Sequence, residues 1–270
     1  MEKWRWIEDS PTDGATQMAV DRAILENAAS FGRVTVRIYR WKPYCISLGY
    51  HQSVENIDLD RCKQDGIDVV RRPTGGRAVL HAEEITYSII IPAGSFPFSA
   101  SVGEVYNFVS RGLVRGIQKL GVPAELQKRT MDLRSHYKTP LSVSCFSASA
   151  RHEVVIGEKK LIGSAQFRFA GGILQHGSIL VGDAHLALPD YLKGIGPGKR
   201  EQLKLVMEGK TISINGYLGR EIGYKEIAEK LRQGMEEEFS IEFENGGLTE
   251  KERKQIPDLR KAFSVLLTTG

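Results

Sequence analysis

The stretch that decides the fold is Arg71-Arg72-Pro73-Thr74-Gly75-Gly76-Arg77-Ala78-Val79-Leu80-His81. Two arginines come before a Gly-Gly pair that predicts a tight turn, and the apolar run after it predicts a strand. Glycines have no Cβ, so the backbone can approach a ligand closely, and the arginines add positive charge and forked donors. The same pattern is also typical of a surface hairpin with solvated arginines, so both interpretations stand at this point.

The composition is that of a globular protein. The 270 residues are 41% hydrophobic and 26% charged, enough for one large domain or a main domain with an appendage. No apolar run approaches the ~20 residues that span a membrane, and the N-terminus lacks the apolar core of a secretory signal. Three cysteines without metal-ligand spacing fit a reducing compartment, so we expect a cytosolic protein and no bound metal. The net charge of +4 permits an acidic protein partner but falls short of the basic clusters of nucleic-acid-binding proteins.

The apolar periodicity predicts alternating helices and strands along the chain. A long polar loop is expected over residues 127–142 and a flexible linker over 194–199. Ser101 with Glu104, and Thr249 with Glu252, have the spacing of capping boxes and predict helix starts. The expected helices are 12–29, 57–65, 101–120, 224–239 and 249–263. The expected strands are 1–10, 34–41, 45–50, 67–70, 78–80 paired with 85–91, 153–156 in a hairpin with 160–162, and 173–181.

Two residues outside the opening stretch have chemistry of their own. Cys145 is a possible nucleophile, because thiolates attack carbonyl groups and a nearby cation lowers the pKa of a thiol. Lys160 can supply that cation, or stabilise the negative charge that develops on an attacked thioester. The small run Gly163-Ser164-Ala165 leaves room for a substrate. Each feature also has a plain interpretation, since a lone cysteine is often a small buried hydrophobe and a lone lysine a solvated charge. Cys45 and Cys62 lie in or beside apolar segments and are expected to be structural.

Three motifs taken together resemble the lipoate–protein ligase/octanoyltransferase family. They are Arg-Arg-Pro-Thr-Gly-Gly-Arg-x-Val-Leu-His at 71–81, Lys-x-x-Gly-Ser-Ala-Gln at 160–166 and Leu-Gln-His-Gly-Ser-Ile-Leu at 174–180. Their order and separation match that family from the N-terminal helix to about Asp183. The resemblance implies an α/β (α+β) fold, a mixed central β-sheet flanked by helices, as in the catalytic domain of biotin and lipoate protein ligases. It also implies that the turn and the lysine-containing hairpin enclose an acyl group.

Within the family the chain is most similar to the cysteine-dependent octanoyltransferases of Gram-positive bacteria. There a Cys-Phe pair precedes the lysine motif, as Cys145-Phe146 does here. The resemblance implies that Cys145 accepts an octanoyl group from acyl carrier protein and that Lys160 assists. The octanoyl group then passes to a lysine of a lipoyl domain, such as that of glycine cleavage protein H, without a cofactor. Alternatives are an ATP-dependent lipoate ligase, an amidotransferase between lipoyl domains, and a binding protein that has lost catalysis.

Two positions depart from the family pattern. Arg77 stands where the ATP-dependent ligases more often have a third glycine, which favours the transferase. Ala82 follows His81 where the family usually has an acidic residue, and Glu83 or Glu84 is a possible substitute.

By the resemblance, the remaining motif residues bind substrate. His81 and His176 are expected to line the pocket or bond backbone, with a role as catalytic base as the alternative. Arg71 and Arg72 either hold the turn or contact the donor. The predicted substrate-binding residues are Arg71, Arg72, Gly75, Gly76, Arg77, His81, Gly163, Ser164, Ala165, His176 and Gly177. We expect a single acyltransferase domain over 1–270, with a catalytic core at about 30–215 and a C-terminal helical segment at about 222–268.

Overall fold

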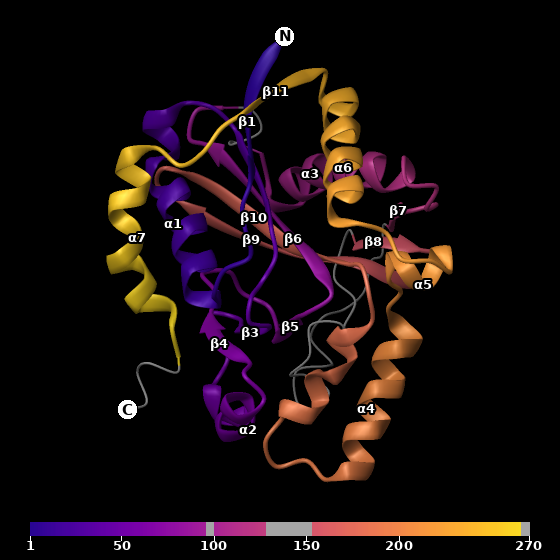
Figure 1. The fold of residues 1–270 in the computed structure, drawn as a ribbon. Helices are drawn as coiled ribbons and strands as arrows, with labels where there is room; N and C mark the ends of the chain where they lie inside the picture. Colours follow the sequence, from indigo (N-terminus) through magenta and orange to yellow (C-terminus); the bar gives the residue numbers. More distant parts are fainter. Residues whose placement is uncertain (96–99, 128–152, 266–270) are drawn as a thin grey trace.

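The computed structural model describes residues 1–95, 100–127 and 153–265. These residues form one eight-stranded mixed sheet in the order β11-β1-β2-β6-β10-β9-β8-β7, and a second, three-stranded sheet in the order β4-β3-β5 (Figure 1). The large sheet contains β1 (Glu2–Glu8), β2 (Thr35–Tyr39), β6 (Glu84–Pro92), β7 (Glu125–Gln127), β8 (Glu153–Ile156), β9 (Lys159–Phe169), β10 (Gly172–Leu180) and β11 (Ile241–Asn245). The small sheet contains β3 (Cys45–Leu48), β4 (Asp68–Arg71) and β5 (Val79–His81). The predicted fold class, a mixed sheet flanked by helices, is confirmed.

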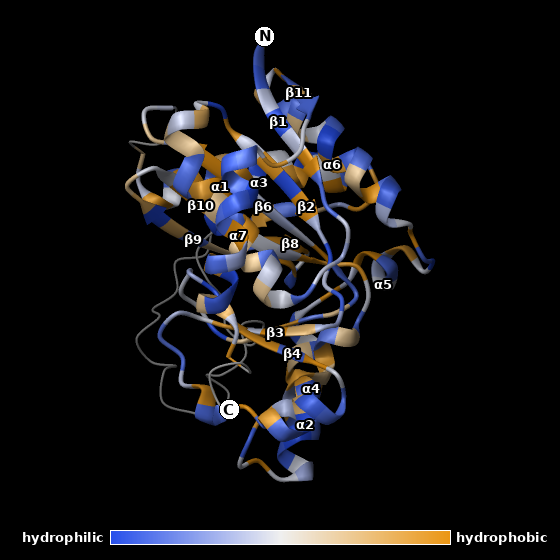
Figure 2. Ribbon diagram, turned by 60° about the vertical axis from the view of Figure 1, so that its left-hand side comes forward, coloured by the Kyte–Doolittle hydropathy of each residue, from blue (hydrophilic) through white to orange (hydrophobic). Residues whose placement is uncertain are grey.

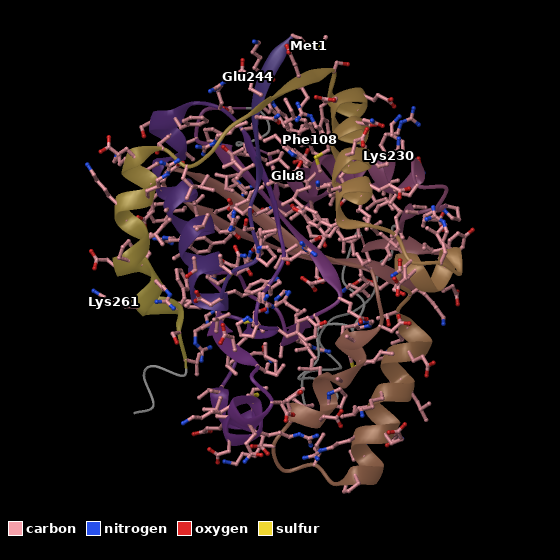
Figure 3. All side chains as sticks on the ribbon, in the orientation of Figure 1. Met1, Glu8, Phe108, Lys230, Glu244 and Lys261 are labelled. Carbon is pink, nitrogen blue, oxygen red and sulfur yellow. The ribbon has the colours of Figure 1, made fainter. Side chains whose placement is uncertain are left out.

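Helices cover both faces of the large sheet. On one face, α3 (Val102–Gln118) and α6 (Tyr224–Phe239) enclose the main hydrophobic core with every second residue of the central strands. On the other face, α1 (Gly14–Phe31) packs on β6 and β10, and α7 (Glu250–Phe263) packs against α1. Figure 2 shows the apolar strands inside and polar residues on the outward sides of these helices. The side chains of Lys230, Glu244 and Lys261 project outward in Figure 3, whereas Phe108 stacks on Phe239 with ring centroids 4.3 Å apart.

Shorter helices surround the small sheet. They are the 3-10 helices η1 (Val54–Asn56) and η5 (Ala184–Tyr191), with α2 (Leu59–Gln64) and α4 (Pro197–Lys210). Helix α5 (Ile214–Leu218) instead packs through Ile214 on the main hydrophobic core. Leu203 and Met207 of α4 are buried in a separate hydrophobic cluster with β3, β5 and η5. In the part of the chain that the structure describes, no helix is long and apolar enough to cross a bilayer.

The predicted helix starts are confirmed. Ser101 and Glu104 form a reciprocal capping box at α3, and Thr249 and Glu252 form a second one at α7. Each box satisfies backbone N–H groups that have no partner within the first turn of the helix. The predicted hairpin of β8 and β9 is also present, with Gly157 at φ +59° in its turn.

One predicted strand pairing is wrong. Residues 78–80 and 85–91 do not pair with each other, because β5 pairs with β3 whereas β6 lies between β2 and β10. The chain changes sheets at Ala82 and Glu83, where the Glu83 carbonyl accepts bonds from the Val181 and Gly182 amides. Both strands are buried on all positions, so the hydrophobic pattern does not indicate which partner each one takes.

Two elements near the C-terminus differ from the sequence prediction. The linker predicted at 194–199 is partly helical, because Pro197 occupies the first turn of α4, where a missing N–H costs nothing. Strand β11 was not predicted, because its sequence is polar. It pairs with β1 in parallel and forms an edge of the large sheet. Helix α7 is anchored to β1 by a buried, two-pronged ion pair between Arg5 and Glu252, with N–O distances of 3.0 and 2.7 Å. The C-terminal segment is therefore built into the layers.

Candidate active site

Two rows of mostly polar residues cross the large sheet, and part of each row forms the floor of a pocket. Neighbouring strands place Arg37, Ser88, His176 and Ala165 side by side, and next to them Tyr39, Thr86, Ser178 and Gly163. Because side chains alternate along a strand, these residues share the face that bears α1. The strands β6 and β10 are otherwise rich in isoleucine and leucine, so a buried polar row here calls for partners.

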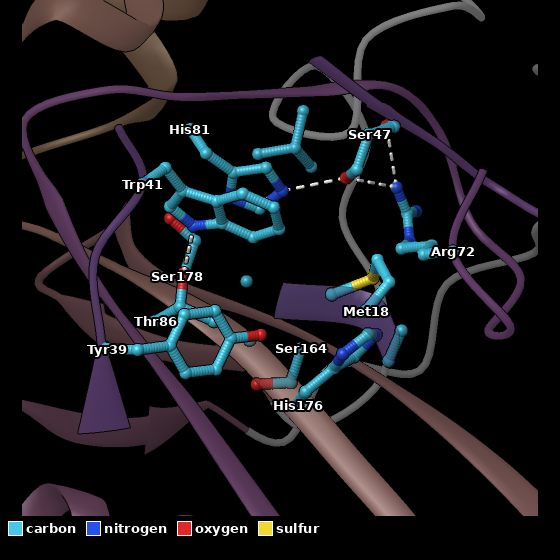
Figure 4. Close-up of a pocket in the computed structure, with 14 residues that line it drawn as sticks. Met18, Tyr39, Trp41, Ser47, Arg72, His81, Thr86, Ser164, His176 and Ser178 are labelled. Atoms are coloured by element: carbon cyan, nitrogen blue, oxygen red, sulfur yellow. Dashed lines mark hydrogen bonds between the residues drawn. The ribbon is translucent and has the colours of Figure 1, made fainter. Parts of the chain in front are cut away.

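The small sheet and the N-terminal half of α1 complete the pocket. Ser47 comes from β3, Val79 and His81 from β5, and Met18 from α1. Trp41 follows β2, and Arg72 belongs to the turn after β4. Figure 4 shows these side chains around a cavity of about 440 Å³, a volume that includes its opening to solvent. The site lies where the two sheets meet.

Arg72 ties the turn together from inside. It is buried, and its guanidinium donates to the Thr74 hydroxyl (3.1 Å), the Ser47 carbonyl (2.9 Å) and the Ser47 hydroxyl (3.0 Å). Those bonds use Nε and Nη1 of Arg72. The third nitrogen, Nη2, donates to the carbonyls of Gly75 (3.0 Å) and Arg77 (2.7 Å). Arg71 instead holds the neighbouring loop, donating to the carbonyls of Gly49, Tyr50 and Gln52. Both arginines therefore bind backbone carbonyl groups, Arg72 within the turn and Arg71 in the loop beside it.

His81 is held between a carboxylate and a hydroxyl. Its Nδ1 lies 2.8 Å from the Glu84 Oε1, and its Nε2 lies 2.7 Å from the Ser47 Oγ. The Trp41 ring stacks on the imidazole with centroids 4.2 Å apart. The carboxylate of Glu84 also accepts bonds from the hydroxyls of Thr86 and Ser178. Of the two substitutes expected for the acidic residue missing at Ala82, Glu84 is the one that contacts the histidine.

His176 has a similar environment on the opposite wall. Its Nε2 lies 2.8 Å from the Thr74 Oγ1, and its Nδ1 lies 3.4 Å from Asp21. Burial lowers the pKa of His176, although Asp21 acts to raise it. Burial also acts to raise the pKa of Asp21, but Arg37 and His176 outweigh it and hold that pKa below its ordinary value. His176 is thus kept neutral by its surroundings.

Gly177 allows strands β9 and β10 to pack as closely as they do. A Cβ there would lie 2.3 Å from the Gly163 carbonyl oxygen and 2.8 Å from the Tyr87 ring. Gly163, Ser164 and Ala165 line the pocket together with His176 and Gly177. All five residues were predicted from the sequence to lie at the substrate-binding site. Their role in binding substrate stays a prediction.

Lys160 lies on the same strand as this glycine-containing run. Its Nζ donates to the Glu153 carboxylate at 2.7 Å, and both side chains are buried. At the usual rise of a strand, Lys160 is about 10 Å before Gly163 along β9. It is not among the residues that line the described pocket.

The two glycines of the turn after β4 do not lie at the described pocket, where the sequence predicted them to bind substrate. Gly75 and Gly76 are exposed and Arg77 is half-buried, and none of the three lines the described pocket. Gly76 adopts φ +101°, which glycine tolerates best. The close approach falls at Gly49 instead, where a Cβ would lie 2.0 Å from the Gly76 carbonyl oxygen. From the motif, Arg72, Val79 and His81 form the wall.

The two described cysteines are unsuited to nucleophilic chemistry. Cys45 and Cys62 are free and buried. Burial raises the pKa of Cys45 well above its usual range and that of Cys62 to about 12. The structural role predicted for both is consistent with this burial. The predicted nucleophile, Cys145, lies outside the described residues.

The sequence reasoning did not single out several residues of the pocket. They are Asp21, Tyr39, Trp41, Ser47, Thr74, Thr86 and Ser178. One available signal was the alternation of Glu84, Thr86 and Ser88 with isoleucine in a strand that is otherwise apolar. Such a row in a buried strand predicts a polar site.

Comparison with known proteins agrees with this geometry. Residues 13–236 match the lipoyl protein ligase A/B catalytic domain, and the chain belongs to that family. The chain is 37% identical to octanoyltransferase LipM of Clostridioides difficile, over 97% of both chains. It is also 37% identical to octanoyltransferase LipM of Geobacillus kaustophilus, over 97% of this chain and 95% of that protein. These near full-length similarities identify the chain as an octanoyltransferase, and therefore as an acyltransferase enzyme.

Solved structures show the same fold. A bipartite lipoate protein ligase from Thermoplasma acidophilum, solved as part of a lipoylation system with its E2 lipoyl domain, has a TM-score of 0.77. That similarity is at 23% sequence identity and covers 97% of this chain and 93% of that one. A lipoate-protein ligase A bound with ATP has a TM-score of 0.75 at 23% identity, over 97% and 95% of the two chains. The fold is that of lipoate-protein ligases.

Proposed function

We propose that the chain transfers an octanoyl group from octanoyl-acyl carrier protein to Cys145, and then from Cys145 to a lysine of a lipoyl domain. The main support for this proposal is that two of the three cysteines in the sequence are unsuited to act as the nucleophile. Cys45 and Cys62 are buried thiols whose pKa is raised, so neither is available as a thiolate at neutral pH. A thiol nucleophile in this chain is then Cys145.

The chain connection supports this assignment. Cys145 stands eight positions before Glu153, and an extended chain of eight steps spans at most about 26–29 Å. Glu153 bonds Lys160 on β9, which leads into the pocket at Gly163. We propose that Lys160 assists as a cation, either by favouring the thiolate or by stabilising charge on the attacked thioester.

The pocket suits an acyl chain followed by a carbonyl group. Its wall includes the apolar side chains of Met18, Trp41 and Val79, and burial of an acyl chain is worth about 0.8 kcal/mol per CH₂ group. A thioester is activated enough to react with an amine, so the second step needs no ATP. We propose an acidic carrier protein as donor, in keeping with the net charge of +4. We propose a lipoyl-domain protein, such as glycine cleavage protein H, as acceptor, and the cytosol as the compartment.

Mass spectrometry tests this function directly. The protein is incubated with octanoyl-acyl carrier protein in the absence of ATP, and its peptides are searched for an octanoyl adduct that hydroxylamine removes. We expect the adduct on the Cys145 peptide, its loss in Cys145→Ala and its retention in the matched control Cys45→Ala. An adduct that forms only from an octanoylated lipoyl domain would favour an amidotransferase. No adduct, together with ATP-dependent modification of a lipoyl domain, would refute the proposal.

A further inference from the structure

Two similar chains of hydrogen bonds end on Arg72. One runs from Asp21 through His176 to the Thr74 hydroxyl, and the other runs from Glu84 through His81 to the Ser47 hydroxyl. The same guanidinium donates to both hydroxyl oxygens, at 3.1 and 3.0 Å. Figure 4 shows His81, Ser47 and Arg72 in line along one side of the cavity.

Counting donors fixes the proton positions in the Ser47 chain. The Glu84 carboxylate can only accept, so the His81 Nδ1 carries the proton that is donated to it. The Nε2 of the neutral ring then accepts from the Ser47 hydroxyl, whose oxygen accepts from Arg72. His81 is therefore set to receive a proton from the Ser47 hydroxyl.

The two chains differ in the charge behind the histidine. Asp21 is already paired with Arg37 at 2.7 Å and bonded by the hydroxyls of Tyr39 and Ser88. Glu84 is bonded by His81 and by the neutral hydroxyls of Thr86 and Ser178. The negative charge of Glu84 is thus directed at His81 over 2.8 Å, against 3.4 Å between Asp21 and His176. The contact between Glu84 and His81 is therefore the shorter of the two, and among the described residues Glu84 has no cationic hydrogen-bond partner like Arg37.

We propose that Ser47, His81 and Glu84 form a proton relay for the second step of octanoyl transfer, an inference that rests on the proposed function. The acceptor lysine attacks as a free amine, the N–C bond forms, and the C–S bond breaks with its electron pair leaving on sulfur. The proton that the nitrogen must lose passes to the Ser47 oxygen as the Ser47 proton passes to the His81 Nε2. Glu84 is the positioning residue, and Arg72 stabilises the negative charge that the Ser47 oxygen carries in transit.

Other titratable groups surround His81, and each has its own partner. Arg72 reaches it from the turn, His176 and Tyr39 from the large sheet, and Asp21 lies behind these two from α1. The charge of Glu84 also acts electrostatically on Cys45 of β3 and on His185 of η5. A variant that removes the relay must leave these groups in place, which favours small changes such as Ser47→Ala and Glu84→Gln.

The relay is tested in the second step alone. Wild type and Ser47→Ala are first loaded with octanoyl-acyl carrier protein, and the octanoyl-enzyme is then mixed with a lipoyl domain or with hydroxylamine in single turnover. We expect Ser47→Ala to slow transfer to the lipoyl-domain lysine by about 10²-fold, the lower end for general base catalysis. Discharge to hydroxylamine should change far less, because the nitrogen of that weakly basic amine loses its proton to water readily once the N–C bond has formed.

Matched variants separate a relay from a structural role. Ser88→Ala removes a buried hydroxyl that donates to Asp21 and does not line the pocket, and it should keep the wild-type rates with both amines. Glu84→Gln should reproduce the selective loss, and it answers the question if Ser47→Ala does not fold. Equal slowing with both amines, or no slowing with the lipoyl domain, would overturn the relay. Failure of the wild type to form the octanoyl-enzyme would instead overturn the proposed function, and the relay with it.

Discussion

Replacing Arg72 by methionine removes the donor that holds the pocket wall. Three of its acceptors are buried, namely the Ser47 carbonyl and the hydroxyls of Ser47 and Thr74. The hydroxyls keep their histidine partners, so each loses only the net value of a hydrogen bond, about 0.5–1.5 kcal/mol. The buried Ser47 carbonyl loses this donor, and leaving it so costs the larger desolvation penalty of about 1–3 kcal/mol. The free energy of unfolding should therefore fall by about 2–6 kcal/mol in Arg72→Met.

Arg71→Met is the matched control, because its acceptors lie in partly exposed loop backbone that water can reach. Its cost should stay below about 1 kcal/mol. Guanidinium chloride unfolding of the wild type and both variants measures the difference, with the m-value as a check on two-state behaviour. Equal losses for the two variants, or a loss below about 0.5 kcal/mol for Arg72→Met, would refute the claim that the buried guanidinium organises the turn.

Four further outcomes follow from particular contacts. Glu252→Ala leaves the buried Arg5 guanidinium unpaired, so thermal unfolding should show a loss of about 3–5 kcal/mol, whereas Glu250→Ala on the exposed side of α7 should cost little. Because the pKa of His176 is lowered in the folded state, the unfolded chain binds the extra proton first, and stability should fall as pH drops below about 6.5, less steeply in His176→Gln. Gly177→Ala should lower activity and the melting temperature together, because its Cβ would clash with the Gly163 carbonyl oxygen; normal values for both would contradict the packing described. Brief iodoacetamide treatment of the native protein should alkylate Cys145 in preference to Cys45 and Cys62, and early modification of either buried thiol would show that its burial is incomplete.

Much of the fold could be predicted from local patterns. Capping boxes at Ser101 and Thr249 gave two helix starts, since the pattern itself contains the hydrogen-bonding partners. Strand partners could not be predicted in the same way, because β5 and β6 are buried on both faces and their sequences fit either sheet. Strand β11 carries charges at Glu242 and Glu244 that obscure its pairing with β1.

The site was predicted in part for a related reason. His81, His176 and Arg72 stand inside recognisable motifs, and all three line the pocket. Asp21 is far from His176 in the sequence, and only the packing of α1 on the sheet brings the two together. Glu84 is close to His81 in the sequence and was one of the two acidic candidates named there, but the choice between them depends on the change of sheets at Glu83. Sequence spacing does not show the contact of Asp21, although the polar alternation of β6 indicates that partners exist.

The central claim is that the octanoyl group travels through Cys145. The direct measurement is a chase in which isotopically labelled octanoyl-enzyme, freed of donor, meets an unlabelled lipoyl domain without ATP. If the octanoyl group travels through Cys145, we expect the label to leave the Cys145 peptide and to appear on one lipoyl-domain lysine. The rate should be no slower than steady-state turnover. Label that stays on Cys145 while turnover continues from fresh donor would contradict the claim.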